Sequence, residues 1–229
     1  MRCIAIVAGM LALASLVSAS PICMPGTLAS YISLGAGGCM IGTNAVSNFI
    51  ALSGTSGATP ISTASVNITT SGGTSNPTLL FTVSQSPGQG AAVETIFDYR
   101  IAANTYTNST LTLSGSSETG SGGVTDLQNI CIGGTWGASG VTACSSGKTA
   151  SLTTVDGIQN MDSSALTAAA FLSVTDDIEL DGPATGAVGT DSFTATTAAP
   201  EPATWYLFAM GLAVSAFLKI KVAAVGKGN

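Results

Sequence analysis

The middle of this 229-residue chain consists of short β-branched and aromatic runs, each bounded by glycine, serine, asparagine or proline. The clearest run is residues 93–101, where Val93, Phe97, Tyr99 and Ile101 share one face and polar side chains share the other. No apolar 3.6-residue periodicity extends through this region. Many short strands separated by turn signals predict an all-β fold, a jelly-roll-like β-sandwich.

Other strand candidates share this alternation or an apolar centre, and they are residues 48–52, 65–70, 78–83, 111–113, 127–132, 150–155, 169–181 and 192–197. Residues 28–34 fit either a short helix or a strand, and Gly35 ends them. We therefore expect one β-sandwich domain over residues 20–193.

The first 19 residues predict a signal peptide. Arg2 gives a positive start, residues 4–17 are apolar, and Ala19 is the small residue expected at a cleavage site. This apolar run is shorter than the roughly 20 residues that cross a bilayer. We expect cleavage after Ala19 and export of the remaining chain.

The C-terminal residues 203–229 predict a transmembrane helix with a basic tail. Trp205 opens an apolar run to Leu218, and Lys219 and Lys221 follow it. Interfacial aromatic residues at one end and lysines at the other place the tail in the cytoplasm and the domain outside.

Residues 194–202 predict a linker that ends in Pro200-Glu201-Pro202. This motif, followed by the apolar run and the lysines, resembles the PEP-CTERM sorting signal. The resemblance implies processing by an exosortase-type membrane protease in a Gram-negative-type bacterium that makes extracellular polysaccharide. It transfers no enzymatic or binding residue. The body resembles one group of these proteins at Cys23, 26–28, Tyr31, Leu34, 38–39, 41–42, 48–49, 131–134, Cys144 and 172–178.

Four cysteines remain once Cys3 leaves with the signal peptide, and an even count in an exported chain predicts two disulfides. Three connectivities are open. We favour Cys23–Cys39 and Cys131–Cys144 because each pair closes a short loop within one glycine-rich segment. A zinc site is the alternative, but the chain has neither a Cys-x-x-Cys pair nor a histidine.

Charge and composition exclude several functions. Two basic and eleven acidic residues lie between positions 20 and 199, giving a net charge of −9, so we expect no nucleic-acid partner. The absence of histidine excludes Ser-His-Asp and Cys-His catalysis. Glu94 and Glu118 are the remaining candidate pair for a hydrolase. Glu94 and Asp98 would lie about 13 Å apart along one strand, and we expect them on a charged, solvated face.

The densest acidic run lies near the end of the domain. On a strand, Asp177, Glu179 and Asp181 would project together, while Ile178 and Leu180 would point inward. These carboxylates are candidate ligands for calcium. The alternative is an edge strand protected by charge.

Trp136 lies in a glycine-rich loop between two cysteines. An exposed tryptophan there would stack on a sugar ring, which suits a polysaccharide matrix. The alternative is that it covers one end of the sandwich core.

These patterns together predict an exported structural or interaction protein of the cell surface or exopolysaccharide biofilm matrix, without catalysis. The expected partners are the processing enzyme, the membrane before processing, and exopolysaccharide or further copies of the chain. No cofactor is required unless calcium binds. A carbohydrate-binding module and a secreted hydrolase are the two alternatives.

Overall fold

The computed structural model describes residues 20–54, 57–114, 122–137, 140–184 and 186–197. The predicted signal peptide, the sorting motif, the C-terminal helix and Glu118 lie outside these residues. Within them, no helix is long and apolar enough to cross a membrane.

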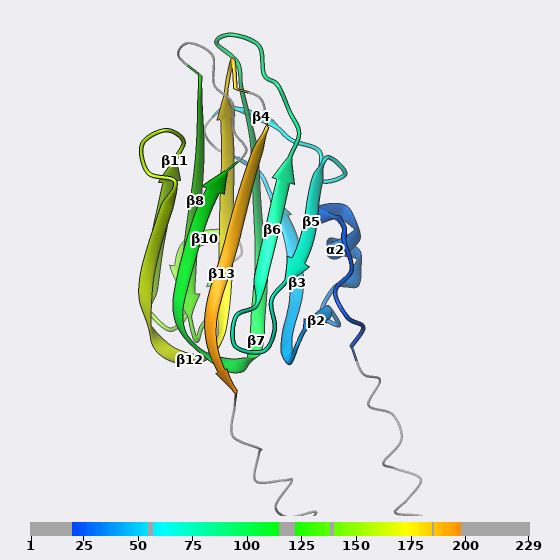
Figure 1. The fold of residues 1–229 in the computed structure, drawn as a ribbon, viewed down its shortest axis with the longest axis vertical. Coiled ribbons are helices and arrows are strands. Elements are labelled where there is room, and N and C mark those ends of the chain that lie inside the picture. Colours follow the sequence, from blue (N-terminus) through cyan, green and yellow to red (C-terminus); the bar gives the residue numbers. More distant parts are fainter. Residues whose placement is uncertain (1–19, 55–56, 115–121, 138–139, 185, 198–229) are drawn as a thin grey trace, which may run out of the picture. The chain divides into compact units, whose positions relative to one another are not determined.

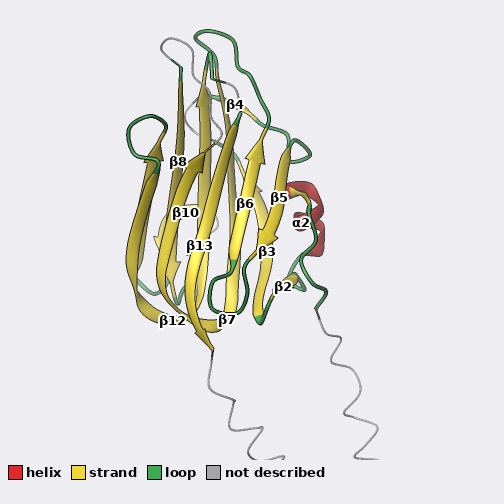
Figure 2. Cartoon of the chain, in the orientation of Figure 1, coloured by secondary structure: helices red, strands yellow, loops and turns green. Residues whose placement is uncertain are grey.

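The described chain is all-β apart from one short helix (Figures 1 and 2). In chain order, its elements are β1 (Gly26–Thr27), α2 (Leu28–Leu34), β2 (Cys39–Ile41), β3 (Asn44–Leu52), β4 (Thr59–Pro60), β5 (Val66–Ser71), β6 (Thr78–Val83), β7 (Ala92–Ser114), β8 (Gly123–Ile132), β9 (Trp136–Gly137), β10 (Gly140–Cys144), β11 (Thr149–Val155), β12 (Met161–Asp181) and β13 (Ala187–Thr197).

Most strands belong to one large sheet in the order β1-β5-β6-β13-β7-β12-β8-β11, with β2, β3 and β4 branching from it and β9 paired with β10 separately. The strand pairs whose registers are described are antiparallel except for the short pairing of β4 with β7. The long strands run side by side, with β5, β6 and β13 in front in Figure 1.

Two long strands, β7 and β12, allow this sheet to fold over itself. The first half of β7 pairs with β3, whereas its second half lies beside β13, where Thr112 Oγ1 donates to the Thr190 carbonyl at 3.4 Å. Between these halves, Ala103 has a φ of 81°, and the register with β12 shifts near Ala169. Because β-bulges bend strands, these irregularities mark the fold line of the sheet.

The two layers meet in an aromatic core. Phe81 on β6 lies 4.8 Å from Phe97 on β7 between ring centroids, although these strands are not neighbours in the sheet. The predicted alternation of β7 is confirmed, since Phe97, Tyr99 and Ile101 are buried. This packing makes the fold sandwich-like, as the sequence predicted.

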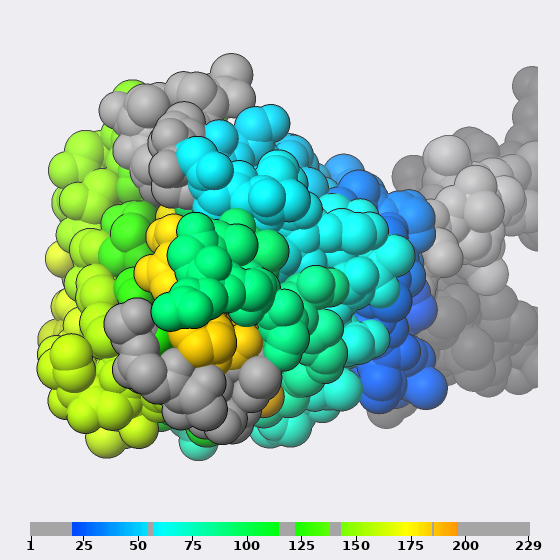
Figure 3. Space-filling view, turned by 90° about the horizontal axis from the view of Figure 1, so that it is seen from above, coloured from blue at the N-terminus to red at the C-terminus, as the bar shows by residue number. Residues whose placement is uncertain are grey.

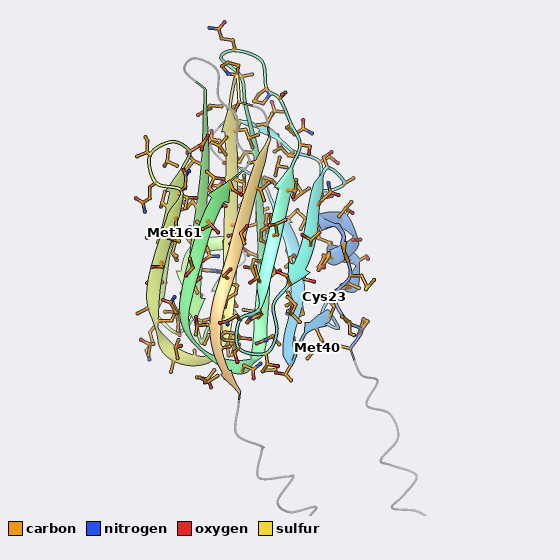
Figure 4. All side chains as sticks on the ribbon, in the orientation of Figure 1. Cys23, Met40 and Met161 are labelled. Carbon is orange, nitrogen blue, oxygen red and sulfur yellow. A yellow bond between two sulfur atoms is a disulfide. The ribbon has the colours of Figure 1, made fainter. Side chains whose placement is uncertain are left out.

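Both favoured disulfides are present. The Cα atoms are 4.8 Å apart in Cys23–Cys39 and 5.3 Å apart in Cys131–Cys144. Cys23 lies beside Met40, whose carbonyl accepts a hydrogen bond from the Cys23 amide at 3.0 Å (Figure 4). Two disulfides indicate folding in an oxidising environment.

Residues 28–34 are the helix α2. The Thr27 hydroxyl caps it by accepting a hydrogen bond from the Ser30 amide at 3.2 Å, which satisfies one of the free donors of the first turn. The helix buries Tyr31, whose ring packs edge-on against Phe49 at 5.1 Å.

The loops at one end of the sandwich are visible from above, where the green segment near residues 85–91 lies against the yellow residues of the early 180s (Figure 3). The Gly182 amide donates to the Ala91 carbonyl at 2.8 Å, and the Gly186 amide donates to the Gln85 carbonyl at 2.8 Å. These bonds join the turn after β6 to the turn before β13.

Two features of the strands differ from expectation. Strand β12 is central, because it pairs with β7 on one side and β8 on the other, so its acidic residues do not protect a sheet edge. Strand β13 continues to Thr197, so residues 194–197 of the predicted linker belong to the sheet. There the Ala195 amide donates to the Ser75 carbonyl at 2.8 Å.

Three aspartates face the interior. Asp126 on β8, Asp176 on β12 and Asp191 on β13 are each at most 1% exposed. Burial is the main cause that raises the pKa of all three, and the charge of Asp191 raises those of Asp126 and Asp176 further. The Tyr99 hydroxyl donates to Asp191 Oδ2, whereas neither Asp176 carboxylate oxygen has a donor within the described residues. We infer that protons, rather than cations, neutralise this cluster.

This burial predicts a stability that falls as the pH rises. An unfolded aspartate loses its proton near pH 4, whereas the folded carboxyls keep theirs to higher pH, so the folded state binds more protons above pH 4. The free energy of unfolding should then decrease by about 1.4 kcal/mol per pH unit for each retained proton. Thermal and urea unfolding between pH 4 and pH 8 measures this slope.

Asp176→Asn should reduce that slope and raise stability at pH 8, because the amide resembles the neutral acid in shape. Asp181→Asn is the matched control, since Asp181 is exposed on the same strand. A stability that rises over this pH range, or equal slopes for both variants, would contradict the assignment.

Candidate functional site

A pocket of about 170 Å³ opens on the outer face of strands β3, β7 and β12. Its lining combines apolar, aromatic and polar groups, namely Asn48, Ile50, Asp98, Tyr99, Arg100, Thr135, Trp136 and Ser173. The strand register explains why residues distant in sequence meet here. Arg100 pairs with Ser47 and Ser173, and Asp98 pairs with Ile50 and Thr175.

The loop that carries Trp136 is held closely against β12. Gly133 has a φ of 67°, and its amide donates to the Phe171 carbonyl at 3.0 Å. Gly134 leaves no room for a side chain, because an added Cβ would lie 2.7 Å from the Ser146 amide nitrogen and 2.9 Å from Cys131 Sγ. The Ser173 hydroxyl donates to the Gly134 carbonyl at 2.9 Å and fixes the loop over the sheet.

The disulfide Cys131–Cys144 closes this loop, and Trp136 pairs with Cys144 in the short β9–β10 ladder. Thr135 and Ser145 add two hydrogen bonds, from the Thr135 amide to Ser145 Oγ at 2.9 Å and from the Ser145 amide to the Thr135 carbonyl at 3.0 Å. Trp136 is half-buried and is not one of the buried core residues. It therefore lines the pocket instead of covering the end of the core.

Two donors in this region have no partner among the described residues. Trp136 Nε1 and Arg100 Nε are both buried atoms without a hydrogen bond. The Arg100 guanidinium carbon lies 4.0 Å from the centroid of the Phe171 ring, which holds the plane of the group in place. A buried donor left unpaired costs about 1–3 kcal/mol, so both atoms favour an incoming acceptor.

Asp98 supplies an acceptor beside them. It accepts a hydrogen bond from Thr175 Oγ1. Partial burial raises the pKa of Asp98, while the bond from Thr175 acts in the opposite direction. The pocket thus offers donors and an acceptor next to the indole of Trp136 and the side chain of Ile50, which is 55% exposed.

Glu94 does not lie on a solvated face as expected. It is only 5% exposed and lies beneath the segment around Gly54, where an added Cβ would contact Glu94 Oε2. Glu179 is opposite Glu94 in the register between β7 and β12, and Asp177 lies on the same face of β12 as Glu179. Burial, followed by the charges of Glu94 and Glu179, raises the pKa of Asp177 to about 7.

The predicted calcium ligands Asp177, Glu179 and Asp181 lie on one face of β12. Glu118, the predicted partner of Glu94 in hydrolysis, lies outside the described residues, so that carboxylate pair stays a prediction. As predicted, Ile178 and Leu180 are buried, and their polar neighbours point to the other face. Within the described ranges, however, no set of three His, Cys, Asp or Glu residues is placed to hold a metal ion.

A larger pocket of about 390 Å³ lies along β6 and β13, near the end seen in Figure 3. It is lined by Thr82, Val83, Ser84, Gln85, Ser86, Gly186, Ala187 and Val188. These residues provide neither an aromatic ring nor a charge, so the Trp136 pocket is the stronger candidate for specific binding.

The sequence suggested Trp136 as a candidate site residue, but it did not indicate the other residues that line the pocket. Asp98 and Arg100 were placed on a solvated strand face, because alternation alone does not show that a loop covers that face. Asn48 was placed in a strand and in the family resemblance, but it was not predicted to be a site residue. The signal available for it was the pair of polar residues, Ser47 and Asn48, between the apolar Val46 and Phe49, which interrupts strict alternation.

Comparison with known proteins does not identify a family or a function for this chain. No protein-family model matches the chain, and no curated protein matches it. One solved structure with some similarity is TmCBM61 in complex with β-1,4-galactotriose, at 9% sequence identity over 57% of this chain and 87% of that chain, with a TM-score of 0.30. A similarity at this level assigns neither fold nor function.

The close fit of Gly134 gives a test of the site's construction. Gly134→Ala should lower the free energy of unfolding by about 1–3 kcal/mol, because the added methyl group overlaps the Ser146 backbone and the disulfide. Gly73→Ala is the control, since a Cβ there meets nothing within 4 Å. Urea unfolding of both variants measures the difference, and equal stabilities would show that the loop is not closely packed.

Proposed function

We propose that this protein is an exported, non-catalytic carbohydrate-binding protein that holds one sugar unit of an uncharged polysaccharide in the Trp136 pocket. One observation supports this most directly: an indole and an exposed isoleucine lie beside unpaired donors and a carboxylate acceptor.

Sugar rings have apolar C–H faces and a rim of hydroxyl groups. The indole of Trp136 and the Ile50 side chain suit the apolar face, while Arg100 Nε, Trp136 Nε1 and Asp98 suit the hydroxyls. The volume of about 170 Å³ is below the ~300–1,000 Å³ of sites for drug-sized ligands, which fits a single unit of a longer chain.

Charge narrows the ligand class. The formal net charge between residues 20 and 199 is −9 and stays negative when the three interior aspartates hold protons, and the acidic residues Asp177 and Glu179 lie on the same face of β12 as Ser173 of the pocket. A polyanionic chain such as a polyuronate would be repelled at long range and at the site. An uncharged polysaccharide would not be repelled by these charges.

The absence of catalysis is part of the proposal. Asp98 is the single carboxylate among the pocket's lining residues, so it has no second carboxylate there for general acid–base or nucleophilic hydrolysis. The pocket suits retention of a polymer better than its cleavage.

The two disulfides and the sorting-signal resemblance at Pro200-Glu201-Pro202 support a proposed location outside the cytoplasm. We infer export, anchoring by the C-terminal segment until an exosortase-type enzyme processes it, and a final place on the cell surface or in the exopolysaccharide matrix. Binding to the matrix polysaccharide would then keep the released protein near the cell.

Replacement of Trp136 tests the function. Trp136→Ala should weaken binding to the producer's own polysaccharide by about tenfold or more, because the stacking surface is lost. Affinity electrophoresis in gels containing that polysaccharide measures the change as a loss of retardation. The control is Met161→Ala, which removes an exposed apolar side chain that is not part of the pocket.

Unretarded migration of the parent protein would argue against carbohydrate binding. Equal retardation of parent and Trp136→Ala would place the binding surface elsewhere.

A further inference from the structure

We propose that Asn48 is the specificity-determining residue of this pocket, and that its left-handed backbone aims the side-chain amide at the hydroxyl groups of the bound sugar. This inference rests on the carbohydrate-binding function proposed above. It concerns the role of a single side chain that the fold itself does not require.

The backbone of Asn48 is unusual. Its φ is 57°, and within the described residues Ala103 is the one other non-glycine residue with a positive φ. L-residues avoid this region, although asparagine tolerates it better than most. Such conformations gather at binding sites, where the surrounding structure holds them in place.

The conformation results from a β-bulge. The register between β3 and β7 shifts between Ser47 and Ile50, and the Asn48 amide donates to the Gly35 carbonyl at the end of α2 at 3.0 Å. The bulge turns Phe49 into the core, where its ring lies 5.3 Å from that of Tyr99. Asn48 and Ile50, on either side of Phe49, are both exposed and line the pocket.

The fold needs the bulge at this position but does not need asparagine. Glycine adopts a positive φ at least as readily and would allow the same path for β3. The exposed Asn48 side chain makes no hydrogen bond to any described residue, so no side-chain hydrogen bond from it stabilises the surrounding loop. The Asn48 side chain does, however, line the pocket.

The amide completes the polar groups of the pocket. It offers both a donor and an acceptor, as a sugar hydroxyl does. Arg100 Nε is a donor and Asp98 an acceptor on the neighbouring strand β7. A sugar ring stacked on Trp136 would place its hydroxyl groups between the Asn48 amide, Arg100 Nε and Asp98. The configuration of these hydroxyl groups would therefore decide how many hydrogen bonds form.

The test replaces Asn48 with glycine in the full-length chain, which removes the amide and keeps the backbone conformation. We expect a melting temperature within a few degrees of the parent and an affinity about 3- to 10-fold weaker, as for the loss of one neutral hydrogen bond. Asn48→Ala is the comparison variant. It should melt about 2–4 °C lower, because alanine is strained at this φ.

Isothermal titration with β-linked gluco- and galacto-oligosaccharides, which differ in the configuration of one hydroxyl, measures selectivity. The parent should prefer one of the two, and Asn48→Gly should reduce that preference. A purely structural role for Asn48 would change stability but not the preference. Retention by Asn48→Gly of both the affinity, within twofold, and the preference would overturn this proposal.

Trp136→Ala in the same titration separates this inference from the proposed function. If Trp136→Ala loses binding while Asn48→Gly does not, carbohydrate binding stands and the role of Asn48 is rejected. If the parent binds neither series, the selectivity proposed for Asn48 is rejected, and affinity electrophoresis with the producer's polysaccharide decides the proposed function. If Trp136→Ala binds as the parent does, both proposals fail.

Discussion

The antiparallel pairing of β7 with β12 is the contact on which the rest of the molecule depends. It runs almost the full length of both strands, and each strand contributes to both layers of the sandwich. The inner faces of the two strands carry Tyr99 and Asp176, while the outer faces carry Arg100 and Ser173. The core and the pocket therefore lie on opposite sides of the same strands, so a change that separates β7 from β12 would disrupt the core and the pocket together.

The same pairing explains how an acidic chain tolerates a polar interior. Between residues 20 and 199 the only cations are Arg100, on the outer face, and Lys148, in an exposed loop, so they leave the interior carboxyl groups without a cationic partner. Burial raises the pKa of these groups and so favours their protonated forms. An acidic exterior and protonated interior carboxyls both favour folding at mildly acidic pH.

Local patterns in the sequence predicted local features well. Alternation identified the strand around Phe97 and Tyr99, the cysteine spacing favoured the correct disulfides, and the position of Trp136 marked the loop of the site. The sequence did not predict which strands lie next to each other in the sheet. Pairings such as β13 with β6 join residues more than a hundred positions apart, and alternation says nothing about them. Asp176 illustrates the limit, because its acidic run suggested an edge strand, whereas it lies on the buried face of a central strand.

The central claim is that the indole of Trp136 contacts a sugar, and nuclear magnetic resonance tests it most directly. With ¹⁵N labelling, the Trp136 indole N–H gives its own signal, which Trp136→Phe assigns by removing it. Because Trp136 Nε1 has no partner in the described structure, saturation with fragments of the producer's neutral polysaccharide should shift this signal. A signal that stays unchanged while the polysaccharide is bound would show that the sugar does not occupy this pocket.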